Sequence, residues 1–226
     1  MTFSLVARCA ETGMLGIAIS SSSPAVAARC AYTRAGVGAV ASQNITDPRL
    51  GPLVLDRMEI GLSATDAIEA MRKECEFLDY RQVLAVDKHG GTAIHSGGNA
   101  LGIWSEAKAE NVASGGNLLA NADVPAAIVA AFTDSKGHLG DRLIAAMKAG
   151  LAAGGEAGPV HSRRHADRGR TRLARRGPAL RLDGGLPDRG SGDGMGDLQA
   201  PARRLRHARA RSERGTVLWR AGGRVS

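Results

Sequence analysis

The chain has 226 residues and a formal net charge of +8, but its charges are unevenly distributed. Residues 1–160 hold 13 Lys and Arg against 16 Asp and Glu, a net charge of −3, whereas residues 161–226 hold 17 Arg against 5 Asp and 1 Glu, a net charge of +11. No apolar run approaches the roughly 18 residues that a membrane-spanning helix needs, and the first residues lack the basic and apolar segments of a secretory signal.

The beginning of the chain alternates short apolar runs with turn residues, which predicts β-strands. TFSLVAR (2–8) and MLGIAIS (14–20) flank a Glu-Thr-Gly turn and predict a β-hairpin. The run SSSSP breaks the second strand, and residues 25–34 read as a short helix or a loop. AGVGAVASQ (35–43) predicts a third strand, whose glycines suggest a close approach of neighbouring backbone.

Helical patterns then alternate with further strands. Residues 47–61 predict a loop that enters a helix, and Ser63, with Asp66 three residues later, predicts the cap of a second helix. Strands are expected in RQVLAVD, TAIHSG and ENVASGGN (81–87, 92–97, 110–117), and two more helices from Asp123 and from about Leu139. This order predicts an α+β domain over residues 1–160, in which antiparallel hairpins pack against helices.

Residues 161–226 use a different set of amino acids. After Ser162 the chain contains no Ile, Phe, Tyr, Lys, Asn or Cys, and no apolar period runs for long. Such a segment buries too little apolar area to offset the entropy of ordering it. The change in composition favours an out-of-frame translation; a disordered Arg-rich arm and an unrecognised folded segment are the alternatives. Apart from Trp219 no aromatic side chain is available to stack on bases, so a nucleic-acid partner is not expected.

Several motifs of the first 162 residues follow the pattern of one family. They are MTFSLVARCAETGMLGIAISSSSPAVAARC, AGVGAVASQNITDPRLGP, RQVLAVD, HSGGNALGIW and SGGNLLAN, and they occur in this order. The chain thereby resembles the domain of unknown function 1028 family, which is grouped with the N-terminal nucleophile (Ntn) hydrolases. The resemblance implies a four-layer αββα sandwich, with two antiparallel sheets face to face and helices outside them. It stops at GPVHS (158–162), where family members continue differently, which supports the out-of-frame interpretation.

The resemblance assigns the chemistry to Thr2. In Ntn hydrolases the first residue of the mature chain attacks a carbonyl group, and its own α-amine, with a pKa of about 8, takes the proton. Removal of Met1 would expose Thr2 in this role. Threonine also starts edge strands for purely structural reasons. Ser4 has the same strand parity as Thr2 and could line the same pocket.

An acyl-transfer site also needs donors for the oxyanion that forms. Asn44, with Gln43 beside it, and the turn Gly115-Gly116-Asn117 are the candidates, although Asn and Gly are also the usual residues of turns. We therefore predict Asn44 and Asn117 as catalytic and Gly116 as substrate-binding.

Three further residues are candidates for substrate binding, each with a structural alternative. Arg34 could bind a carboxylate or form a surface salt bridge, and Asp47 could bind substrate or open an Asp-Pro turn. His95, late in a strand, could act as a general base or be a satisfied histidine at the rim of the core.

The function that follows is a hydrolase acting on an amide-like bond in a small molecule or short peptide. The alternative is a non-catalytic protein of the same fold that binds a small ligand or serves in assembly. We expect a cytoplasmic protein, because the three cysteines are odd in number and read as reduced thiols. No membrane partner is expected, since no apolar run is long enough to span a bilayer. The resemblance implies a homo-oligomer, because Ntn-like folds often associate through their helix layers. No metal and no cofactor are expected, since no His or Cys spacing suits a metal and no phosphate-binding glycine motif is present.

Overall fold

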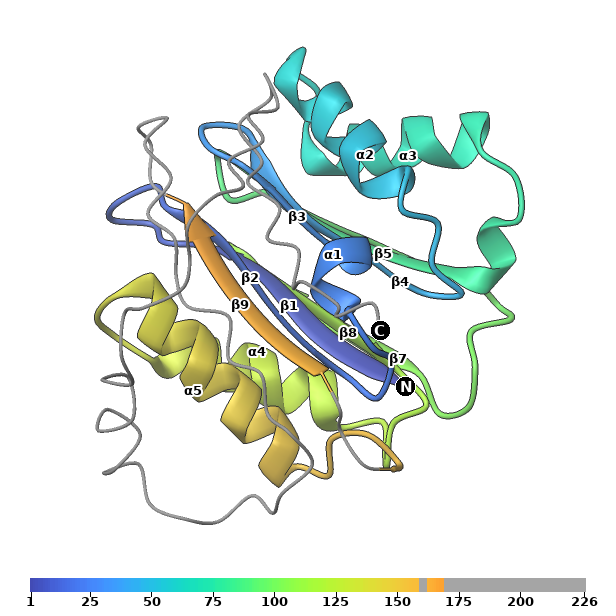
Figure 1. Ribbon diagram of the computed structural model, residues 1–226. Helices are drawn as coiled ribbons and strands as arrows, with labels where there is room; N and C mark the ends of the chain where they lie inside the picture. The colour runs from blue at the N-terminus through green and yellow to red at the C-terminus, as the bar shows by residue number, and fades with distance from the viewer. Residues whose placement is uncertain (159–161, 169–226) are drawn as a thin grey trace, which may run out of the picture. The chain divides into compact units, whose positions relative to one another are not determined.

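The computed structural model describes residues 1–158 and the backbone of residues 162–168 (Figure 1). Nine strands and five α-helices occur in this part of the chain, together with a 3-10 turn, η1, at Leu78–Tyr80. The strands are β1 Thr2–Arg8, β2 Leu15–Ser21, β3 Ala31–Arg34, β4 Gly38–Asn44, β5 Arg81–Asp87, β6 Thr92–Ser96, β7 Ser105–Ala109, β8 Val112–Asn117 and β9 Ser162–Arg168. The helices are α1 Val26–Cys30, α2 Leu50–Glu59, α3 Ala64–Glu74, α4 Val124–Asp134 and α5 Leu139–Ala152. The predicted α+β class is confirmed.

The strands form two antiparallel sheets. One sheet has the order β7-β8-β1-β2-β9 and the other the order β3-β4-β5-β6. The first strand, β1, lies in the middle of its sheet, where Thr2 is opposite Ser21 of β2 on one side and Asn117 of β8 on the other. The N-terminus of the chain is therefore flanked by strands on both sides.

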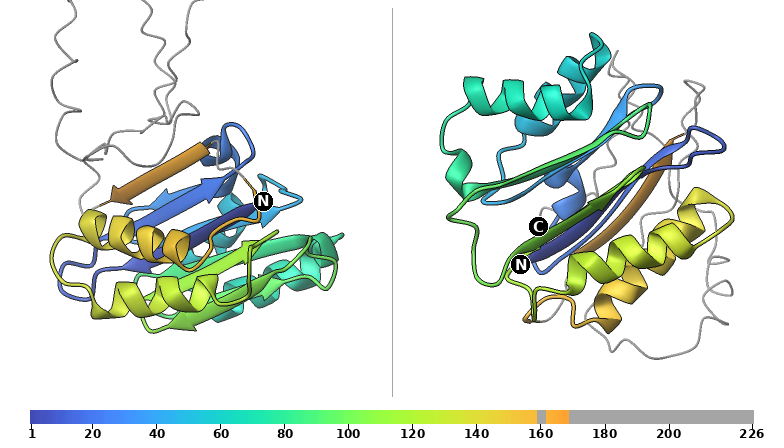
Figure 2. Two further views of the ribbon diagram at one scale, coloured as in Figure 1. Left: turned by 90° about the horizontal axis from the view of Figure 1, so that it is seen from below. Right: turned by 180° about the vertical axis from the view of Figure 1, so that it is seen from behind.

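Each sheet has one face toward the other sheet and one face toward a helix pair (Figures 1 and 2). Phe3 and Leu5 of β1 belong to a core cluster with Ile128 of α4 and Leu143 of α5. On the second sheet, Val40 belongs to a cluster formed with buried residues of α2 and α3. Because β1 and β5 are covered on both faces, their sequences are almost continuously apolar instead of alternating.

The apolar part of the layer between the sheets is built from small and branched side chains. Its buried members are Val6, Leu15, Ile17, Ala39, Ala41, Leu84, Val86 and Ala113, drawn from strands β1, β2, β4, β5 and β8. All are at most 1 % exposed, so this layer excludes water. Hydrophobic burial of such side chains is the main term that holds two sheets together.

Helix-capping patterns in the sequence were correct in one case and wrong in another. Ser63 caps α3, since its hydroxyl accepts a hydrogen bond from the Asp66 N–H at 3.1 Å. Asp123 precedes α4 as expected, but its side chain makes no capping hydrogen bond. Its backbone is already helical (φ −81°, ψ −13°), and its own N–H donates to Asn121 Oδ1, so Asn121 orders this turn instead.

Three strands were not expected from the sequence: β3 and β7 within the first 160 residues, and β9 beyond them. The segment predicted as a helix or loop, 25–34, contains the five-residue helix α1 and then β3, which pairs with β4. Strand β7 has the sequence SEAKA, and Ala, Glu and Lys are poor strand formers. It forms because its backbone pairs with β8 along its full length.

The backbone of Ser162–Arg168 forms β9, which pairs with β2 from Ser21 to Leu15. Strand β9 therefore lies beyond the domain boundary at residue 160 that the composition suggested. The remainder of the predicted tail, residues 169–226, lies outside the described residues, so its interpretation stays a prediction.

Candidate functional site

The layer between the sheets changes from apolar to polar at the end where the chain begins. At this end, five buried polar side chains lie between the sheets or at the edge of the layer. They are Thr2, Ser4, Ser21, Gln43 and Gln82, each at most 6 % exposed. Asn117 of β8, 1 % exposed, completes the set. Buried polar groups are costly unless they are hydrogen-bonded, so their partners describe the site.

Three oxygen atoms meet at the start of β1. The hydroxyl groups of Thr2 and Ser21 each lie 2.6 Å from the backbone oxygen of Met1, and 2.9 Å from one another. Only the two hydroxyl protons are available for hydrogen bonds in these three short contacts. The Ser21 hydroxyl also accepts a hydrogen bond from the Ser23 N–H at 3.0 Å. Met1 thus provides the acceptor that both hydroxyl groups use.

A chain of amide side chains crosses from one sheet to the other. Ser4 of β1 donates to Gln43 Oε1 of β4 at 2.6 Å, and Gln43 Nε2 donates to Gln82 Oε1 of β5 at 2.7 Å and to the Gly115 oxygen at 3.1 Å. The nitrogen of Gln82 in turn faces the Ser96 hydroxyl at 3.0 Å. The network fixes the orientation of both amides, since each accepts at its oxygen and donates at its nitrogen.

Asn117 lies beside Thr2 and is only weakly engaged. Its Nδ2 atom is 3.5 Å from Gln82 Oε1, at the limit of a hydrogen bond, so the amide keeps donor capacity for a ligand. Gly116 contributes its carbonyl oxygen, 3.4 Å from Gln82 Nε2, while a Cβ at this position would collide with the Leu119 side chain at 2.6 Å. The structure therefore brings Thr2, Ser4, Gly116 and Asn117 together.

Asn44 follows Gln43 but makes other contacts. Its backbone has a φ of 73°, a left-handed conformation that asparagine tolerates well. Its amide donates to the Tyr80 oxygen at 2.6 Å and accepts from the Leu101 N–H at 3.2 Å. These bonds join two loops, which favours a structural role; a catalytic role for Asn44 stays a prediction.

Arg34 and Asp47 form local ion pairs. Arg34 of β3 contacts Asp56 and Glu59 of α2 at 2.8 and 2.6 Å, on the helix-covered side of its sheet. Asp47 accepts hydrogen bonds from the side chain and the N–H of Arg49, and the Arg49 side chain lowers the pKa of the Asp47 carboxyl group. Both arrangements match the structural alternatives weighed from the sequence, and neither residue contacts the polar end between the sheets.

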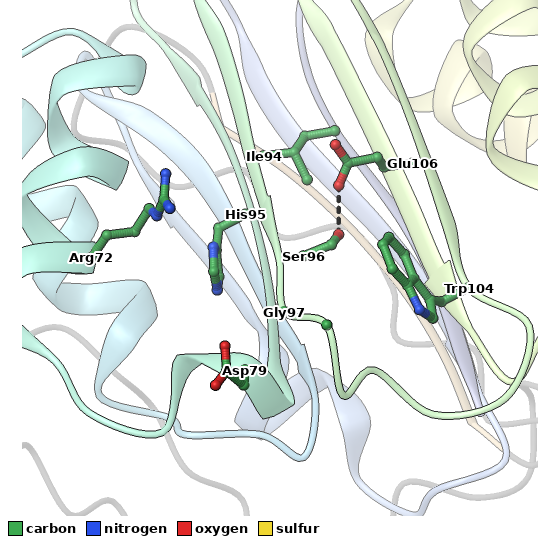
Figure 3. Close-up of a pocket in the computed structure, with 9 residues that line it drawn as sticks. Arg72, Asp79, Ile94, His95, Ser96, Gly97, Trp104 and Glu106 are labelled. Carbon is green, nitrogen blue, oxygen red and sulfur yellow. Dashed lines mark hydrogen bonds between the residues drawn. The ribbon is translucent and has the colours of Figure 1, made fainter.

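His95 lines an open cavity of about 430 Å³ at the edge where β6 and β7 approach each other (Figure 3). Its Nε2 atom lies 2.9 Å from the Leu78 oxygen. The cavity is also lined by Arg72, Asp79, Ile94, Ser96, Gly97, Gly98, Trp104 and Glu106. Ser96 links it to the buried network, because its hydroxyl contacts both Gln82 and Glu106.

The sequence did not single out Gln82 and Ser21 of the polar end, nor Glu156, which contacts Ser22 beside it. Gln82 is the one amide within the apolar run RQVLAVD, and that exception was a usable signal. Ser21 belongs to the run SSSSP, which reads as a loop although Ser21 ends β2. Glu156, which accepts the Ser22 N–H at 2.9 Å, is far away in the sequence and gave no signal.

Among the side chains of residues 1–158, no three His, Cys, Asp or Glu residues are grouped as ligands for a metal ion. The helices of the same residues include none long and apolar enough to cross a membrane.

Comparison with known proteins gives a family and a fold neighbour. The model of a family of unknown function, DUF1028, matches residues 2–164, and so ends within β9. The chain is also similar to protein SPO2555 from Silicibacter pomeroyi, whose crystal structure carries the same family designation. The two are 28 % identical with a TM-score of 0.70, over 74 % of this chain and 73 % of that one. No curated protein matches the chain.

Proposed function

The chain belongs to the DUF1028 family of unknown function, and on this premise we propose that it is an N-terminal nucleophile hydrolase. Its substrate is an amide-like bond in a small molecule or short peptide, and its nucleophile is Thr2 after removal of Met1. The observation that carries this proposal is the group of three oxygens at the start of β1, in which Thr2 and Ser21 share the Met1 oxygen as acceptor.

The proposal includes the architecture. The two sheets with a helix pair on each outer face are compatible with the αββα sandwich of Ntn hydrolases, which supports the assignment by analogy of fold. A central position of β1 is what this chemistry requires, because the first residue must reach a site between the sheets. Thr2 meets that requirement, since β2 and β8 flank it.

Removal of Met1 changes two things at Thr2. The nitrogen of Thr2 becomes a free amine, and an ordinary α-amine has a pKa of about 8, which suits a general base near neutral pH. The Met1 oxygen also disappears, so the Thr2 and Ser21 hydroxyl groups, 2.9 Å apart, need only one proton for their own hydrogen bond. The remaining proton is then available to the amine or to a bound substrate.

In the first step, Thr2 Oγ1 attacks the amide carbonyl carbon while its proton passes to the α-amine. The tetrahedral intermediate expels the leaving amine, which takes that proton, and an ester of Thr2 remains. A water molecule then attacks the ester while one of its protons passes to the same α-amine. The amine returns this proton to Thr2 Oγ1 as the C–O bond breaks, which releases the carboxylic acid and restores the Thr2 hydroxyl group. Each step returns the amine to its neutral form.

Asn117 is the proposed oxyanion donor. It lies opposite Thr2 in the β1–β8 pair, where facing Cα atoms are about 4.5–5.5 Å apart. Its Nδ2 group is held by a single long contact to Gln82, so it can turn toward a developing negative charge without losing a strong hydrogen bond. Removing one such donor typically costs about 100-fold or more in kcat.

The experiment combines intact mass with an electrophile that traps threonine, such as a β-lactone, on the full-length chain. We expect loss of Met1 and a single adduct that maps to Thr2. Thr2→Ala, which keeps a small second residue and hence the removal of Met1, should form no adduct, and Asn117→Ala should form it about 100-fold more slowly. Thr12→Ala, in the exposed β1–β2 turn, is the matched control and should react like the unaltered chain.

Retention of Met1, or a free Thr2 in a folded chain that does not react, would contradict the hydrolase. Those results would favour the non-catalytic alternative, in which the same fold binds a small ligand.

A further inference from the structure

The cavity at the edge of β6 and β7 carries a second inference, which concerns the charge of its ligand. The cavity has a volume of about 430 Å³, enough for a small organic molecule. Backbone at Gly97 and Gly98 forms part of its lining, and a Cβ added at Gly98 would meet no atom within 4 Å. Gly98 is exposed, so this part of the lining opens to solvent.

The wall formed by β7 and the residue before it combines one carboxylate with one aromatic ring. Glu106 and Trp104 both line the cavity, and Figure 3 shows the indole ring and the carboxylate on the same side of Ser96. Trp104 is 37 % exposed, so part of its ring is accessible to a ligand. A carboxylate and an indole ring that line the same cavity are groups that attract an organic cation.

The charge of Glu106 is not compensated by the protein. No salt bridge to Glu106 occurs among the described residues, although Lys108 lies only two residues along β7. The Glu106 carboxylate accepts one hydrogen bond, from the Ser96 hydroxyl at 2.5 Å, and Ser96 in turn contacts Gln82. The network thus orients the carboxylate and leaves its second oxygen to the cavity.

On the other wall, Arg72 is already engaged. Its Nη1 atom lies 3.2 Å from Glu69 of the same helix, and Asp79 adds a second carboxylate to the lining. With two carboxylates and one arginine in its lining, the cavity has a net negative charge. We propose that it binds the ammonium group of an organic ligand, held by Glu106 and by the face of Trp104.

The same placement gives a substrate class, and this extension rests on the proposed hydrolase function. Glu106 is opposite Gly115, and Gly115 is opposite Ser4, so Glu106 lies two strands from β1. At about 4.8 Å per strand, its Cα atom is about 10 Å from that of Ser4. Thr2 lies two residues from Ser4 along β1, so the Cα atoms of Thr2 and Glu106 are about 12 Å apart. The substrate would then carry an ammonium group about 12 Å from the carbonyl group that Thr2 attacks.

The binding test does not depend on catalysis. In the full-length chain with Trp219→Phe, the indole fluorescence comes from Trp104 alone, because the chain has two tryptophans. We expect n-butylammonium to change this fluorescence saturably at constant ionic strength, and n-butanol and butyrate to bind at least about tenfold more weakly. Glu106→Gln should weaken butylammonium binding by about tenfold or more, since a charge-assisted hydrogen bond is lost.

Glu110→Gln is the matched control, because it removes the same charge from the turn of the same hairpin without lining the cavity. It should leave butylammonium binding unchanged. Equal binding of butylammonium and butanol, tighter binding of butyrate, or unchanged binding by Glu106→Gln would each overturn the proposal.

A kinetic comparison then separates this inference from the hydrolase itself. An amide with an ammonium group at the stated separation should be hydrolysed with a higher kcat/KM than its neutral isostere, and Glu106→Gln should remove only that preference. Hydrolysis without the preference would overturn the substrate class, whereas butylammonium binding without hydrolysis of any amide would overturn the hydrolase and retain the cavity.

Discussion

The two buried glutamines, Gln43 and Gln82, are predicted to make coupled contributions to the free energy of unfolding. Gln82→Leu removes the acceptor of Gln43 Nε2 and the donor to Ser96 and to the Ser105 and Gly116 oxygens. Buried groups left without partners cost about 1–3 kcal/mol each, partly offset by the apolar area of leucine. We expect Gln82→Leu to lower the free energy of unfolding by about 2–4 kcal/mol.

Gln43→Leu should have a similar cost, because Ser4 loses its acceptor and Gln82 Oε1 loses its best donor. The double variant removes the 2.7 Å bond between the amides only once and leaves neither amide unpaired. Its loss should therefore be smaller than the sum of the two single losses by about 1–2 kcal/mol. This difference is the coupling energy of the pair.

Urea unfolding followed by far-ultraviolet circular dichroism measures all four proteins, with the m-values compared to test for a common unfolded state. Ser63→Ala with Gln82→Leu is the control pair. Ser63 lies near Asp87, because the N–H of the next residue, Ala64, donates a hydrogen bond to the Asp87 carboxylate. Asp87 is five residues from Gln82 along β5, about 17 Å away, so Ser63 and Gln82 share no contact. This pair should be additive within about 0.5 kcal/mol. Equal additivity for Gln43 and Gln82, or a single variant that is more stable than the unaltered chain, would refute the reasoning.

Two further predictions concern the packing of Tyr32 against α2. Gly51→Ala should destabilise the protein by about 1–3 kcal/mol in urea unfolding, because the added Cβ would lie 2.0 Å from the Tyr32 ring, whereas Gly98→Ala should cost nothing measurable; equal effects would contradict this account. Burial raises the pKa of Tyr32 to about 12, against about 10 in the unfolded chain. The contribution of the neutral phenol to the free energy of unfolding is therefore complete below pH 10 and is lost as the pH rises toward 12. Tyr32→Phe should make stability fall less steeply between pH 10 and 12, and an identical slope would refute the shift.

Much of the fold follows from local signals that the sequence displays directly. The β1–β2 hairpin was predicted from two apolar runs around a Glu-Thr-Gly turn, and α3 from the pair Ser63 and Asp66. Strand β7 could not be predicted, because SEAKA has no strand-forming residue and owes its conformation to pairing with β8. Strand β3 has only four residues, too few for a periodic pattern.

The site was less accessible to sequence reasoning than the fold. Thr2 and Asn117 were selected because the family resemblance and a Gly-Gly-Asn turn pointed to them, and the register places them opposite each other. Gln82 and Ser21 were missed, since nothing local says that a glutamine in β5 meets one in β4, or that one serine of a run ends a strand. Contacts between the two sheets join residues that are far apart in the sequence, and they depend on strand register. Local sequence patterns do not specify that register.

The cost of the polar end argues that it serves more than stability. A few residues along the same strands, Val6, Ala41 and Leu84 pack the two sheets together without any polar group, so apolar side chains suffice for that purpose. Replacing a satisfied buried polar cluster by apolar residues is often neutral or stabilising, and departures from the apolar pattern are expected where a protein has a function to perform. Here the departure coincides with the start of the chain, an end that in most domains is exposed and frays. The Thr2 and Ser21 hydroxyl groups both donate to the Met1 oxygen, so removal of Met1 would free both donors, and this is why the mass of the N-terminus is the decisive measurement.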